Sequence, residues 1–259
     1  MFRSEGTQRT HRQNQAVAAY LATVAGMVNS AGFVLIGSFT SHVTGNVGRF
    51  ADDLAMQRSA APLFALLLVI AFFSGGFLAS MALERSERTR PQTYSALLFV
   101  EAGLLVAFAL LSYAMDTHND RYRDVQAILL CAAMGLQNSL VTRLSGAVVR
   151  TTHLTGVVTD LAIESARAFR AWRYRVAQQI AQQIHLSLPL VAGKPPTTPP
   201  SKPRMYLHLT IVGGFSFGSV VGALGAVRWG QFALLVPAVT LLFAGAYAIN
   251  TLVRGERPA

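Results

Sequence analysis

Long apolar stretches separated by short polar segments dominate this sequence. A helix that crosses the bilayer core, about 30 Å thick, needs about 20 apolar residues at 1.5 Å rise per residue. The stretches that meet this requirement are 16–36, 60–83, 95–115, 125–149, 206–227 and 230–252. They predict an all-α membrane protein with six transmembrane helices.

The composition excludes a water-soluble domain. Charged residues make up 13% of the chain and hydrophobic residues 52%, whereas about a quarter of the residues of a soluble domain are charged. The net charge of +10 alone would suggest a nucleic acid partner. However, the basic residues lie between apolar runs and not on the polar face of a soluble domain. We therefore expect the lipid bilayer as a partner and no nucleic acid.

Lysine and arginine are distributed unevenly between the two sides of the predicted spans. Basic flanking segments are retained in the cytoplasm. With a cytoplasmic N-terminus, fifteen basic residues fall in inner segments and five in outer ones, leaving aside Arg143 and Arg150 near the membrane. The sequence thus predicts six spans with both termini inside, including short tails at 1–15 and 253–259.

An internal repeat divides the chain. Segments 26–46 and 135–157 share seven identical residues in order, after a two-residue insertion in the second. The matched sets are Gly26, Asn29, Ser30, Thr40, His42, Thr44 and Gly45, and Gly135, Asn138, Ser139, Thr151, His153, Thr155 and Gly156. A weaker likeness pairs 75–77 with 213–215.

The repeat predicts two three-helix units, 16–115 and 125–252. Because each unit has an odd number of spans, the second enters the bilayer upside down relative to the first. Inverted repeats are a common architecture of secondary transporters, which bind solute between the two units.

Dense polar clusters adjoin the first and fourth spans. Backbone at membrane depth leaves helical form only where protein or a water-filled cavity satisfies it, and Gly45 and Gly156 suit such a break. We expect a discontinuous or re-entrant element around each His-Thr-Gly sequence. His42 and His153 would line a solute pathway and exchange protons near neutral pH; the alternative is a pair of solvated loop ends. The candidate pathway residues are Asn29, Ser30, Thr40, His42, Thr44, Gly45, Asn46, Gln137, Asn138, Ser139, Thr151, His153, Thr155 and Gly156.

Polar residues inside the spans need partners away from lipid. These side chains either form hydrogen bonds between helices or contact the solute, and the sequence leaves both uses open. They are Asn29, Ser30, Gln137, Asn138 and Ser139. Glu101 and Arg143 lie at comparable depth on neighbouring antiparallel spans, which predicts an intramembrane ion pair. A proton relay through Glu101 is the alternative.

Small residues mark one face of the fifth span, where Gly214, Gly218 and Gly222 recur every four residues. Such stripes allow close helix packing, and we expect a contact within the chain, with a homodimer seam as the alternative. Pro237 predicts a kink within the sixth span.

The longest connection has two parts. Aromatic and aliphatic residues recur at helical spacing among arginines over 161–185, which predicts a basic amphipathic helix in the membrane interface. Residues 186–204 are rich in proline and predict an extended linker.

The sequence contains no motif of an enzyme. HExxH, G-x-S-x-G, P-loop and CxxC patterns are absent, and the acidic residues near the His-Thr-Gly sequences lack defined metal-ligand spacing. We therefore expect no catalytic residues, no cofactor and no metal.

Three motifs carry a resemblance to a known family: SFTSHVTGN (38–46), MGLQNSLVTRL (134–144) and RTTHLTGVVTDL (150–161). They resemble the YoaK-like family of bacterial membrane proteins, a domain of unknown function. The resemblance implies a multi-pass protein of the bacterial inner membrane but supplies no activity. The hypothesis from architecture is a secondary transporter or permease for a small polar or anionic solute. The alternatives are a membrane scaffold or sensor that docks a partner through its basic inner loop, and an intramembrane enzyme that uses the histidines.

Overall fold

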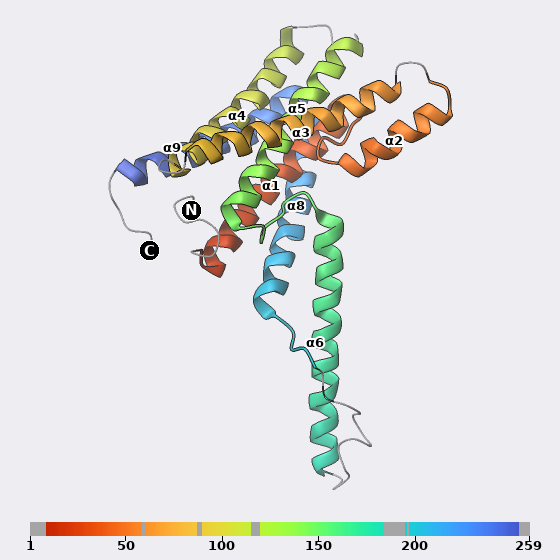
Figure 1. Cartoon of the computed structure of the whole chain (residues 1–259), viewed down its shortest axis with the longest axis vertical. Coiled ribbons are helices and arrows are strands. Elements are labelled where there is room, and N and C mark those ends of the chain that lie inside the picture. The colour runs from red at the N-terminus through yellow and green to blue at the C-terminus, as the bar shows by residue number, and fades with distance from the viewer. Residues whose placement is uncertain are drawn as a thin grey trace.

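The computed structural model describes residues 9–58, 61–86, 90–114, 120–183, 195 and 197–253. Within these residues all regular structure is helical (Figure 1). In chain order the elements are α1 (His11–Ile36), α2 (Val43–Ala55), α3 (Ala61–Arg85), α4 (Arg90–Ala114), α5 (Asp120–Ser145), α6 (Leu154–Gln183), α8 (Lys202–Trp229), the 3-10 helix η2 (Gly230–Leu234) and α9 (Leu235–Val253).

The expected apolar stretches fall in α1, α3, α4, α5, α8 and α9. Five helical segments of the described chain are long and apolar enough to cross a membrane: His11–Ile36, Ala61–Arg85, Gln92–Tyr113, Tyr122–Ser145 and Lys202–Thr251. The last segment contains both α8 and α9, with η2 between them. The protein is therefore an all-α membrane protein, as the sequence predicts.

Pro237 does not kink the middle of a helix, which corrects the expectation. Gly230 adopts a φ of +57° after α8, and η2 separates the two helices. Pro237 then lies in the first turn of α9, where its missing N–H costs no intrahelical hydrogen bond.

Glycines bring α8 against α1. A methyl group added to Gly218 would overlap the backbone carbonyl of Thr23, and one added to Gly222 would overlap that of Met27. Gly214 faces the carbonyl of Ala19 one turn earlier. The stripe therefore packs within the chain, as predicted. The alternative of a homodimer seam along this face is wrong, because α1 already covers it.

A second glycine crossing joins α3 to α5. A methyl group on Gly135 would overlap the carbonyl of Phe72, and one on Gly75 would overlap that of Ala132. The equivalent approaches in the first crossing are Gly26 to Phe215 and Gly218 to Thr23.

These contacts correct the weaker part of the repeat. Phe72 and Gly75 correspond to Phe215 and Gly218, so the likeness between 75–77 and 213–215 is out of register by five residues. Several glycines stand close together in each helix, and the sequence alone does not show which of them correspond between the two units.

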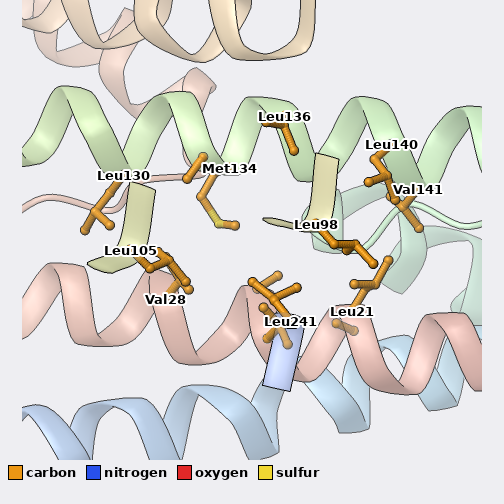
Figure 2. Close-up of a cluster of buried hydrophobic side chains, with 14 of the residues drawn as sticks. Leu21, Val28, Leu98, Leu105, Leu130, Met134, Leu136, Leu140, Val141 and Leu241 are labelled. Atoms are coloured by element: carbon orange, nitrogen blue, oxygen red, sulfur yellow. The ribbon is translucent and has the colours of Figure 1, made fainter. Parts of the chain in front are cut away.

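The apolar core lies between α1, α4, α5 and α9 (Figure 2). Leu98 and Leu105 of α4 reach toward Leu21 and Val28 of α1, and Leu130 and Met134 of α5 close the other side. The helix α9 packs on α4 and contributes Leu241.

Residues 161–183 of the expected amphipathic helix lie in α6, which begins earlier, at Leu154, and residues 184–185 lie outside the described residues. The Glu164 carboxylate joins α6 to the start of α8 by accepting a hydrogen bond from the Ser201 backbone N–H at 2.9 Å. Together with Arg167 at 2.7 Å, that bond holds the pKa of Glu164 below its usual value. The expected linker lies mostly outside the described residues, and its last three, 202–204, already belong to α8.

Candidate functional site

Both His-Thr-Gly sequences follow a break in the helical backbone. The first break begins at Gly37, with a φ of +72°, and the second at Gly146 and Ala147, with φ of +62° and +64°. Gly45 and Gly156, the break positions expected from the sequence, lie instead in the first turns of α2 and α6. His42 is the N-cap of α2, and the carbonyl of His153 accepts the equivalent bond from Val157 in α6.

Matching asparagines tie each loop back to the preceding helix. The Asn29 side-chain oxygen accepts from the Ser41 backbone N–H at 3.2 Å and from its hydroxyl at 2.9 Å. The Asn138 oxygen accepts from the Thr152 hydroxyl at 2.7 Å. Each asparagine lies seven residues before the last residue of its helix, or about 10 Å along the axis. Each loop therefore folds back along the helix that it leaves.

The two loops extend into the bundle from opposite ends of the neighbouring helices α1 and α5. The Gln137 side chain donates to the carbonyl of Leu21 at 3.0 Å, and Leu130 lies against Gly32, so α1 and α5 are antiparallel neighbours. Asn29 lies eight residues beyond Leu21, which places the two asparagines about 12 Å apart along the helix axes. That separation is well below the bilayer core thickness of about 30 Å.

The loops meet at one cavity of about 970 Å³. Its walls come from α3, α5 and the first turns of α2 and α6. The candidate pathway residues that line it are His42, Thr44, Asn138, Ser139, His153, Thr155 and Gly156. The structure thus brings the two His-Thr-Gly elements together.

The remaining candidate residues do not line the cavity. Thr40 and Thr151 are buried, and their hydroxyls have no hydrogen-bond partner in the described chain. Gln137 connects α5 to α1, which is one of the two uses that the sequence left open. Asn29, Ser30, Gly45 and Asn46 complete the set of candidates that do not line the cavity.

Several cavity residues were absent from the sequence-based candidates. Phe72, Phe73 and Phe77 of α3 form an apolar wall, and Ser80 lies at 2.7 Å from Ser139 of α5. Because α3 is uniformly apolar, its sequence does not indicate which of its faces lies toward a cavity.

The two matched glycines differ in their surroundings. The His42 imidazole folds onto Gly45, so that a methyl group there would overlap the ring. A methyl group on Gly156 would meet open space. Gly45 therefore lets His42 keep its place in the cavity wall.

The predicted ion pair between Glu101 and Arg143 is wrong. Arg143 pairs with Glu84 of α3, at the edge of the cavity. Glu101 is fully buried beside Leu98 and Leu105 in the core, and neither carboxylate oxygen has a hydrogen-bond partner within the described residues. The two residues lie on helices that pack on each other, α4 and α5, but each side chain has different neighbours.

Comparisons with known proteins give a family without a known activity. The family model described as "Protein of unknown function (DUF1275)" matches residues 17–247. The UPF0700 transmembrane protein YoaK of Bacillus subtilis (strain 168) is 28% identical over 148 residues, which are 54% of this chain and 62% of that relative. The chain thus covers less than two thirds of the relative's length. No solved structure matches the chain.

Proposed function

This chain belongs to the family described as "Protein of unknown function (DUF1275)", and we propose that it is a secondary transporter or permease for a small polar or anionic solute. It acts in the bacterial inner membrane with both termini in the cytoplasm, and it carries out no catalysis. The observation that carries this proposal is the single cavity lined by both His-Thr-Gly elements. A site between repeated units is where inverted-repeat transporters bind their solutes.

Equivalent contacts in the two units support an inverted repeat. The helix α1 packs on α8 and α5 packs on α3, while α2 packs on α3 and α6 packs on α8. The hydrogen bond from Ser41 to Asn29 in the first unit corresponds to the bond from Thr152 to Asn138 in the second. The helices α4 and α9, which end the two units, pack on each other, as elements near a twofold axis do.

The packing also favours particular moving parts. The glycine crossings join helices from different units, so separating 16–115 from 125–252 would break both crossings. Movement of α1 with α8 against α3 with α5 keeps the crossings intact. Because the cavity lies on α3 and α5 beside both loops, this movement would open and close it.

A flux measurement in proteoliposomes tests the proposal. The purified protein is reconstituted, and uptake of a panel of radiolabelled amino acids, carboxylates, sugars and inorganic anions is compared with uptake into protein-free liposomes. We expect saturable uptake of at least one solute. Uptake equal to that of the protein-free liposomes across the panel would count against transport.

Gly45→Ala provides a matched test of the cavity. Its methyl group displaces the His42 ring, and we expect the uptake rate to fall roughly tenfold, equivalent to about 1.4 kcal/mol. Gly48→Ala adds the same group to the same helix, in open space and outside the cavity, and is the control. Equal rates in the two variants would exclude a role for the His42 position in the pathway.

A scaffold remains a second candidate function, because α6 presents an exposed face. Phe169, Trp172 and Ile180 are exposed there among several arginines. Specific capture of one soluble partner by residues 161–204, with no flux for any solute, would favour this function over transport.

A further inference from the structure

The cavity described above receives the N-termini of two helices. Val43 and Thr44 open α2, and Leu154 and Thr155 open α6; all four line the cavity. The first N–H groups of a helix have no partner within the helix, and the helix dipole places positive potential there. The His42 side chain does not cap α2. Both helix starts therefore offer N–H groups and positive potential to the same space.

A buried side chain adds a donor at this point. Asn138 lines the cavity and is only 9% exposed. Its oxygen is occupied by the Thr152 hydroxyl, while its amide nitrogen has no hydrogen-bond partner in the described chain. A buried amide donor without a partner costs free energy, which an acceptor on a ligand would recover.

The remaining lining residues select for charge and shape. His42 and His153 line the cavity together with Arg143, which pairs with Glu84 of α3 at the cavity edge. No aspartate or glutamate is among the described residues that line the cavity. Phe72, Phe73 and Phe77 supply an apolar surface in the same cavity, against which burying an apolar group is favourable. The cavity therefore combines donors for an anion with an apolar wall.

We propose that this cavity binds a small organic carboxylate with an apolar body. The carboxylate lies between the N-termini of α2 and α6 and accepts from the Asn138 amide, and the apolar body lies against the α3 phenylalanines. This inference names the solute class of the proposed transporter and rests on that function for its biological role. Binding itself requires no transport.

Equilibrium binding to the intact protein in detergent tests the site with three probes of similar size. Benzoate carries the proposed chemistry, benzyl alcohol is neutral and benzylamine is cationic. By isothermal titration calorimetry, we expect benzoate to bind at least about tenfold more tightly than either comparator, because charge of the wrong sign in such a site costs several kcal/mol. Binding of benzylamine or benzyl alcohol as tight as that of benzoate would overturn the carboxylate assignment.

Thr44→Asp places a fixed negative charge at the start of α2. An acidic residue in the first turn stabilises a helix, so loss of folding is not expected. The benzoate dissociation constant should be at least about tenfold higher in Thr44→Asp than in the near-isosteric Thr44→Asn. Gly48→Asp adds the same charge one turn further along α2, outside the cavity and in open space, and should leave binding within about twofold of wild type because exposed charges are screened.

A second variant addresses the donor directly. Asn138→Asp keeps the oxygen that accepts from Thr152 and replaces the free amide by a carboxylate, so benzoate binding should be lost while the loop tether remains. Equal benzoate affinity in Thr44→Asp and Thr44→Asn, or unchanged affinity in a folded Asn138→Asp protein, would overturn the site. Benzoate binding without flux would uphold this site and remove the transporter. Flux of another solute without benzoate binding would do the reverse.

Discussion

Replacing Gly218 by alanine is expected to destabilise the protein more than any other single methyl addition in α8. The new methyl group would overlap the Thr23 backbone carbonyl of α1, and a backbone carbonyl within a helix cannot move aside as a side chain does. Overpacking typically costs about 1–3 kcal/mol, and overlap with a backbone atom places Gly218→Ala at the upper end, about 3 kcal/mol. For a chain of this size that corresponds to a fall of about 6–12 °C in the unfolding temperature.

Gly213→Ala in the same helix is the control. A methyl group there meets open space, and alanine favours helix over glycine by about 1 kcal/mol. Both purified variants are heated, and the protein that remains monodisperse is measured by size-exclusion chromatography. The unfolding temperature should therefore fall strongly for Gly218→Ala and should not fall for Gly213→Ala. Gly135→Ala, at the crossing of α5 with α3, should behave like Gly218→Ala. Equal unfolding temperatures for Gly218→Ala and Gly213→Ala would show that α1 and α8 do not approach as described.

The apolar spans could be predicted because hydropathy reports a property of each segment by itself. Twenty apolar residues need a bilayer or a core wherever they lie, so the helices follow directly. The close approach at Gly218 was predictable for the same reason, since a face without side chains is visible in one helix. Which helix fills that face depends on the whole bundle.

Loop conformations were less predictable. The sequence placed the breaks at Gly45 and Gly156, but these residues start helices, and the chain turns at Gly37 and Gly146. The decisive interactions are the bonds from Asn29 and Asn138 to residues 12 and 14 positions later. A hydropathy profile contains no information on such bonds, and the helix α2 that follows the first loop was missed with them.

The error at Glu101 arose because residue counting identifies neighbouring helices but not the partner of a side chain. Counting residues gives depth along a span, and Glu101 and Arg143 do lie on neighbouring helices. The direction of each side chain depends on which helix faces it, and Arg143 faces Glu84 of α3. Depth alone therefore does not identify a partner.

The repeat also hides a difference between its copies. Asn29 and Asn138 match in sequence and in hydrogen bonding, yet only Asn138 lines the cavity. Matched residues therefore occupy different surroundings in the two units, which a sequence comparison does not reveal.

Two matched alanines provide the sharpest test of inversion. Ala51 of α2 and Ala162 of α6 are both exposed and lie nine residues after His42 and His153, respectively. Cys131 is the only cysteine and is buried, so Cys131→Ala provides a background for single-cysteine variants. In that background Ala51→Cys should react with a membrane-impermeant maleimide added to intact cells. Ala162→Cys should react only after the cells are permeabilised.

The expected difference is nearly all-or-none, because a charged maleimide does not cross the hydrocarbon core, where an ionised group costs several kcal/mol. Mild denaturation in detergent gives the control, since both cysteines must then label fully. Labelling of both from the same side of the membrane would mean that α2 and α6 follow spans of the same direction. The two loops held by Asn29 and Asn138 would then lie on the same side of the membrane. Such an arrangement permits neither an inverted repeat nor a cavity exposed alternately to the two sides.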